Sequence, residues 1–140
     1  MTLLLCTSTF TSCDHAEVDG VFIDHTLYEN LTFKKQTELK TLIHETLEKD
    51  EKALTQLTMF WCGGGAGCYD LGFIITQIIY RLGEDDFIKM VAKLDSEKLL
   101  ELVGLIAAGL EYGDNDKDGK MDDKKIKTEF PRLYKILSDK

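Results

Sequence analysis

Four aspartates near the C-terminal end of the sequence have the spacing of a cation-binding loop. They lie in the segment DNDKDGKMD, as Asp114, Asp116, Asp118 and Asp122. A chain that wraps around a hard cation turns every second residue inward, so carboxylates at the first, third and fifth positions can converge at about 2.3–2.6 Å. Gly119 occupies the sixth position, where a sharp bend favours glycine. The pattern predicts a calcium-binding loop.

The later positions of the segment fit the same prediction. At the seventh position a backbone carbonyl serves as the ligand, so Lys120 is compatible with binding, and Asp122 adds a ligand directly or through water. Met121, at the eighth position, is expected to pin the loop to the core. The predicted metal ligands are therefore Asp114, Asp116, Asp118, Lys120 and Asp122. Calcium is preferred to magnesium, which demands a tighter octahedron. The alternative is a metal-free acidic turn between helices, because Asp, Asn and Gly are ordinary turn residues.

The segment resembles the DxDxDG calcium loop shared by EF-hands, dockerin modules and thrombospondin type 3 repeats. It matches the DxDxDGxxD pattern of the last family in full, but over nine residues only, so the resemblance implies a ligand and no fold. An EF-hand has a bidentate glutamate at position 12, whereas this loop, taken as residues 114–125, has Lys125 there. Asp123 or Glu129 are the candidates to replace that ligand. The departure predicts weaker binding and a structural role in place of signalling.

Two cysteines, Cys62 and Cys68, enclose the glycine-rich stretch GGGAG. In an oxidising compartment this pair predicts a local disulfide, whereas in a cytoplasmic protein the two residues would be buried thiols. The preceding WCG is similar to the start of the thioredoxin active site. That family has two residues between its cysteines and this sequence has five, so we predict no such redox centre.

The first thirteen residues, MTLLLCTSTFTSC, resemble the end of a bacterial lipoprotein signal. In such signals an apolar residue and two small residues precede a cysteine that becomes lipidated. The resemblance implies lipid attachment at Cys13, a signal-peptide remnant over residues 1–12, and a location in the cell envelope, in the periplasm or at the outer membrane. The basic region expected before the apolar stretch is missing. The alternative is a frayed N-terminus with an incidental cysteine, in a cytoplasmic protein.

The spacing of apolar residues beyond Leu27 is helical. It predicts helices at about 33–49, 51–61, 69–82, 84–94 and 96–112, and a last helix from about 122 that Pro131 interrupts. Short links favour antiparallel neighbours, so residues 31–140 are expected to form a single-domain, all-α bundle of five to six helices arranged as stacked hairpins. Residues 13–30 are expected to form a tether with a short turn capped by Thr26, although VFID at 21–24 could be a strand.

Net charge and the absence of catalytic motifs reduce the number of function classes that fit the sequence. A formal net charge of −8 argues against nucleic-acid binding, which needs a basic face. The three histidines have no zinc-site spacing, and no nucleophile motif occurs. We therefore expect a non-enzymatic, calcium-stabilised interaction protein of the bacterial envelope, with a protein partner and membrane contact only through a lipid at Cys13. Size and location make it similar to envelope immunity proteins. The alternative is a small envelope enzyme, a hydrolase or thiol-dependent, with a spatially assembled site.

Overall fold

The computed structural model describes residues 16–139, so the signal-like segment and the expected lipid attachment site at Cys13 lie outside the described residues. The helices in this range are α1 (His25–Glu29), α2 (Phe33–Leu47), α3 (Glu51–Thr58), α4 (Ala66–Leu82), α5 (Glu84–Val91), α6 (Ser96–Tyr112), α7 (Ile126–Glu129) and α8 (Pro131–Ser138). Two short strands, β1 (Ala16–Val18) and β2 (Val21–Ile23), form an antiparallel hairpin. The predicted all-α class is confirmed, with this small hairpin added to it.

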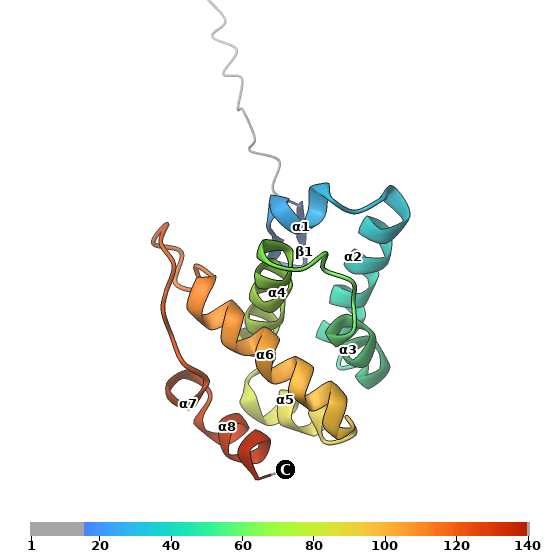
Figure 1. The fold of residues 1–140 in the computed structure, drawn as a ribbon. Coiled ribbons are helices and arrows are strands. Elements are labelled where there is room, and N and C mark those ends of the chain that lie inside the picture. The colour runs from blue at the N-terminus through green and yellow to red at the C-terminus, as the bar shows by residue number, and fades with distance from the viewer. Residues whose placement is uncertain (1–15, 140) are drawn as a thin grey trace, which may run out of the picture.

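The two longest helices, α4 and α6, lie against each other at the centre of the fold (Figure 1). Their backbones meet at a pair of glycines. A Cβ atom on Gly72 would collide with the carbonyl of Leu105, and one on Gly109 would collide with the carbonyl of Gly72. Only residues without a side chain allow helices to approach so closely, so this pair of glycines fixes where α4 and α6 cross.

The other helices pack around this pair. Helix α2 contacts α3 and α4, α5 contacts α4, and α8 contacts α5. Fully buried residues include Leu39 and Ile43 of α2, Ile75 of α4, Phe87 of α5 and Ile106 of α6. These positions follow the 3- and 4-residue spacing from which the helices were predicted. No helix within residues 16–139 combines the length and the apolar content that a membrane span needs.

The N-terminal hairpin and α1 belong to the same core. Val21, Ile23 and Leu27 are each at most 1% exposed, so the core extends further toward the N-terminus than the helical spacing indicated. Asp19 and Gly20 form the two-residue turn with positive φ angles of 49° and 82°, as hairpin turns of this length require. The predicted cap at Thr26 is wrong: Asp24 caps α1 by accepting a hydrogen bond from the His25 N–H.

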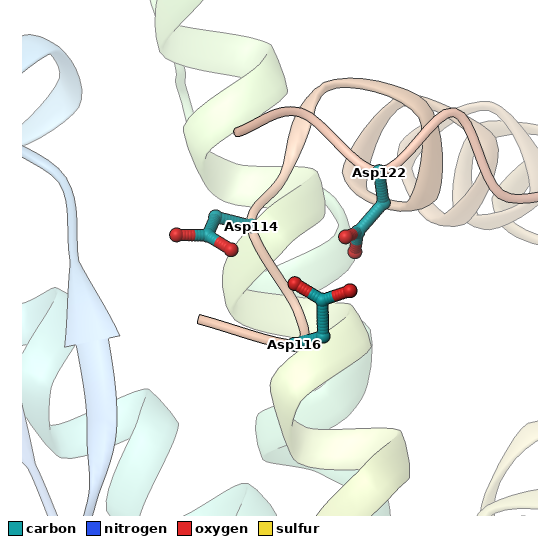
Figure 2. Close-up of side chains that lie close together, drawn as sticks. All are labelled: Asp114, Asp116 and Asp122. Atoms are coloured by element: carbon teal, nitrogen blue, oxygen red, sulfur yellow. The ribbon is translucent and has the colours of Figure 1, made fainter. Parts of the chain in front are cut away.

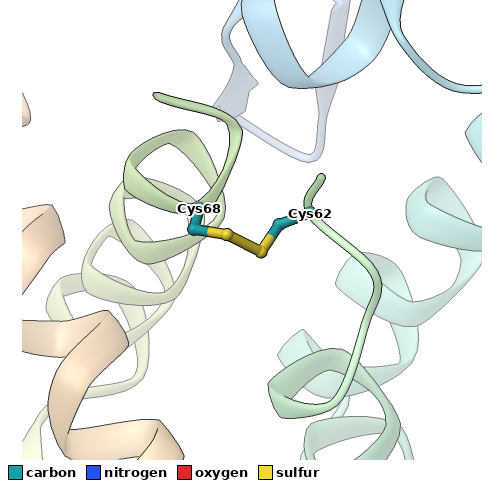
Figure 3. Close-up of a disulfide and its surroundings, with 2 residues drawn as sticks. All are labelled: Cys62 and Cys68. Atoms are coloured by element: carbon teal, nitrogen blue, oxygen red, sulfur yellow. A yellow bond between two sulfur atoms is a disulfide. The ribbon is translucent and has the colours of Figure 1, made fainter. Parts of the chain in front are cut away.

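A disulfide joins Cys62 and Cys68, as predicted, and ties the segment after α3 to the first turn of α4 (Figure 3). Gly63, Gly64 and Gly65 all have positive φ angles, which explains the run of glycines between the cysteines. In the chain-entropy model, so short a closed loop contributes on the order of 2 kcal/mol of stability. Helix α4 begins at Ala66, three residues earlier than predicted, because small residues there carried no apolar signal.

Candidate metal centre

The acidic loop begins where α6 ends and returns alongside that end. The backbone N–H groups of Asp122, Asp123 and Lys124 donate to carbonyls of the α6 terminus, at Gly113, Glu111 and Leu110, over 3.0, 3.1 and 2.9 Å. Asp123 has a φ of 50°, so the returning chain is not helical at this point. The helix predicted from about 122 therefore does not begin there, and the next helix, α7, starts at Ile126.

Three of the predicted ligands come together in the loop. One carboxylate oxygen from each of Asp114, Asp116 and Asp122 lies within 4.8 Å of the others (Figure 2). Among the described residues, this is the only group of at least three His, Cys, Asp or Glu side chains that meets this geometry. Asp122 is the most enclosed member, since its side chain is 2% exposed, whereas that of Asp116 is 52% exposed.

Backbone N–H groups organise the loop around these carboxylates. Asp114 accepts hydrogen bonds from the N–H groups of Asp118 and Gly119, both at 2.9 Å, and Asp116 accepts a longer one from Asp118 at 3.2 Å. Gly119 has a φ of 84°, which confirms the sharp bend expected at the sixth position. The N–H groups of Asp118 and Gly119 thus hold the carboxylates of Asp114 and Asp116, two of the three that would contact a cation, in place.

Asp118 and Lys120 are not part of the converging group. The Asp118 Oδ1 accepts a hydrogen bond from the Lys120 N–H at 2.9 Å, which turns that carboxylate along the loop. The ligand roles of these two residues stay predictions. Met121 is 69% exposed, so the expectation that it pins the loop to the core is wrong.

Asn115 is the residue that anchors the loop in place of Met121. Its side chain accepts a hydrogen bond from the Thr76 hydroxyl at 2.8 Å and donates one to the Gly109 carbonyl at 3.0 Å. Its backbone N–H donates to the Asp122 Oδ2 at 2.8 Å. Asn115 therefore joins the carboxylate group to both central helices. Sequence reasoning missed this role, because nothing in the spacing distinguishes it from an ordinary turn asparagine.

Lys124 places an ammonium group beside the carboxylates. Its Nζ lies 3.2 Å from the Asp122 Oδ2 and 3.7 Å from the Asp116 Oδ2. Burial acts to raise the pKa of Asp122, but hydrogen bonds from Asn115 and the charge of Lys124 outweigh it and hold that pKa below its usual range. Sequence reasoning missed Lys124, because its place beside Asp122 depends on how the chain returns along the end of α6.

The candidates for the missing position-12 ligand are engaged elsewhere. Lys125 itself lies 3.0 Å from Asp123 and 3.2 Å from Glu111, so it forms a separate ionic group. Glu129 accepts a hydrogen bond from the Tyr80 hydroxyl. That contact raises the pKa of Tyr80, after the larger effect of burial. The carboxylate group of the loop is thus made of Asp114, Asp116 and Asp122 without a fourth carboxylate.

This set of oxygens fits a hard cation. Calcium takes six to eight oxygen ligands from carboxylates, carbonyls and water, so three carboxylates that converge in this way are compatible with calcium binding. The two histidines in the described part of the chain lie elsewhere, each paired with one aspartate, His25 with Asp24 and His44 with Asp19. Comparison with protein-family models, with curated proteins and with solved structures gave no match.

Proposed function

We propose that the protein is a calcium-stabilised, non-enzymatic binding protein of the bacterial cell envelope. The observation that supports calcium best is the convergence of Asp114, Asp116 and Asp122 within 4.8 Å, in a segment that also carries the DxDxDGxxD pattern. Carboxylates held so close repel one another, and a divalent cation removes that repulsion. Binding calcium therefore stabilises the loop that joins α6 to the C-terminal helices.

The envelope location is supported by two features. The segment ending at Cys13 resembles a lipoprotein signal, and the Cys62–Cys68 disulfide is typical of proteins in oxidising compartments. Outside the cytoplasm, where calcium is commonly near millimolar, a Kd on the order of 10⁻⁴ M keeps such a loop filled. Calcium then acts as a permanent structural part of the protein and carries no signal.

The test of calcium binding is a calorimetric titration of the protein with calcium after treatment with chelator. We expect one site per chain. Asp116→Asn should weaken binding at least tenfold, since it removes one charge of the group while asparagine keeps an acceptor for the Asp118 N–H. Asp123→Asn removes the same charge from the same segment but outside the carboxylate group, so it should leave the affinity within about twofold. A wild-type protein that takes up no calcium would refute the proposal.

A further inference from the structure

A cleft lies between the acidic loop and the N-terminal hairpin. Its larger part has a volume of about 340 Å³ and is walled by Phe22 of β2 and Phe73 of α4. An adjoining hollow of about 240 Å³ shares Asp24, Phe73 and Asp114 with it and adds Tyr69, Asp70 and Tyr112 as well as four residues at the end of α6 and in the acidic loop. We call the whole the aromatic cleft and define it by Phe22, Asp24, Tyr69, Asp70, Phe73 and Tyr112. Mostly apolar cavities of this size with a few polar groups are typical ligand sites.

The carboxylates of the aromatic cleft lack a strong cationic partner. Within residues 16–139, no lysine or arginine nitrogen lies within 4 Å of Asp24 or Asp70. Asp24 contacts His25, and one oxygen of Asp70 accepts the Leu27 N–H at 2.7 Å. Other acidic side chains of the chain do pair with lysine: Asp86, for example, lies near both Lys49 and Lys89. Three carboxylates, of Asp24, Asp70 and Asp114, line the cleft against two lysines, Lys117 and Lys120, so a small excess of negative charge lies beside the aromatic walls.

One ammonium group already lies against these walls. The Nζ of Lys117, from the acidic loop, is 5.0 Å from the centre of the Phe22 ring, a cation–π distance. Lys117 has no carboxylate within 4 Å among the described residues. The aromatic face thus holds a cation without the help of an ion pair, which indicates the kind of guest that the cleft favours.

We propose that the aromatic cleft receives an arginine side chain of a protein partner. The apolar stem fits the surface of Phe22 and Phe73, and the planar guanidinium pairs with Asp24 and Asp70 at the cleft's edge. The stacked rings of Tyr69 and Tyr112, 4.3 Å apart, give the guanidinium a face on which to lie. The net charge of −8 favours such a basic partner. The inference rests on the proposed binding role and not on calcium.

The test is an amide NMR titration of the full chain with the blocked tripeptide acetyl-Ala-Arg-Ala-amide, in chelator and again in calcium. The control peptide carries citrulline, which has the shape of arginine without its charge. We expect saturable shifts at Phe22, Asp24 and Phe73 for arginine alone, with a Kd on the order of 10⁻³ M. Equal shifts from both peptides, or none from arginine in either condition, would overturn the inference.

Variants and a third probe sharpen the result. Asp70→Asn keeps an acceptor for the Leu27 N–H but removes the charge, and should weaken the arginine peptide about tenfold. Lys117→Ala removes the resident ammonium and should strengthen binding a few-fold. Asp95→Asn, which removes a charge outside the cleft, should leave the affinity for the arginine peptide unchanged. Agmatine is a small molecule with a free guanidinium and an amine. If it binds ten times more tightly than the peptide, the cleft favours a small guanidinium compound, and the proposal of a protein partner is overturned. Binding of the peptide with no uptake of calcium would refute the calcium proposal alone.

Discussion

At the scale of single residues, one lysine in the acidic loop partly neutralises the charge of three carboxylates. Asp114, Asp116 and Asp122 converge, and the Lys124 ammonium lies against the last two. Only 26% of the Lys124 side chain is exposed, so its charge is less screened by water than that of most surface lysines. Lys124 is therefore a tethered cation that, under the calcium proposal, an incoming calcium ion would displace or oppose.

Replacing Lys124 with methionine tests this competition. Without the ammonium, calcium no longer meets a positive charge at the site, and its affinity should rise roughly tenfold at low salt, about 1.4 kcal/mol. In chelator the same variant should melt earlier than wild type, because the three carboxylates lose their counter-ion. Calorimetric titration and thermal melts measure the two effects. Lys125→Met is the matched control, since Lys125 pairs with Asp123 and Glu111 outside the group. An unchanged calcium affinity in Lys124→Met would contradict competition.

Asp70 gives a pH-dependent prediction. Burial raises the pKa of Asp70 from 3.8 to about 6, against the opposing hydrogen bond from the Leu27 N–H. The folded protein thus holds this proton more tightly than the unfolded chain, and the resulting stability is complete below pH 3.8 and is lost as the pH rises through about 6. Asparagine cannot ionise, so Asp70→Asn should raise the Tm at pH 7.5 by about 2–5 °C and hardly at pH 4.

Asp95→Asn is the control for that experiment, because its sign is opposite. The hydrogen bond from Lys98 lowers the pKa of Asp95, so its contribution to stability is present at neutral pH and is lost as the pH falls. The variant should therefore lower the Tm at pH 7.5. A Tm of Asp70→Asn that differs from wild type equally at pH 4 and pH 7.5 would show that the carboxyl of Asp70 does not titrate as described.

At the scale of the elements, the positions and most starts of the helices followed from apolar spacing, whereas several helix ends and the last helix start did not. The predicted helices at 33–49, 84–94 and 96–112 correspond to α2, α5 and α6 within three residues at each end. Strand β2 lies within VFID at 21–24, the segment named as a possible strand, whereas β1 was not predicted, because three residues are too few for alternation to be read against neighbouring turns. The last helical region is interrupted at Pro131 as predicted but begins at Ile126 instead of about 122. The backbone of residues 122–124 pairs with the end of α6, a contact between distant residues that local spacing does not encode.

Part of the candidate site could likewise be predicted from local sequence, and part of it could not. Its inward-facing aspartates follow a local two-residue alternation, which is visible in the sequence. The anchoring by Asn115 depends on Thr76, which is 39 residues away in the chain, so it required the fold. The aromatic cleft likewise combines residues of β2, α4 and the end of α6, and no segment of the sequence contains enough of it to be recognised.

The crossing of α4 and α6 provides a prediction with a control on the same helix. Gly109→Ala places a methyl group against the backbone of Gly72, so the helices must separate, and we expect a loss of roughly 1–3 kcal/mol of unfolding free energy. Gly104 is exposed, and a Cβ there meets nothing within 4 Å. Gly104→Ala should stabilise the protein by about 0.5–1 kcal/mol through helix propensity. Urea unfolding measures both. Similar changes of the same sign in the two variants would contradict the close crossing.

At the scale of the whole molecule, the proposed calcium site and the aromatic cleft share one loop. Asp114 lines the cleft and also belongs to the carboxylate group, and Asn115 joins the loop to both central helices. A loop fixed by calcium therefore holds one wall of the cleft in place. This arrangement explains why a structural cation would be useful to a protein with a net charge of −8, whose proposed role is to bind a basic partner.

The measurement that tests the calcium claim most directly is a thermal melt of the protein in chelator, in calcium and in magnesium. We expect calcium at about ten times its Kd to raise the Tm by several degrees, as mass action predicts for a ligand of the folded state. Magnesium should have little effect, and Asp116→Asn should remove most of the rise while Asp123→Asn keeps it. Identical melting in chelator and in millimolar calcium would contradict the account and leave DNDKDGKMD as an acidic turn.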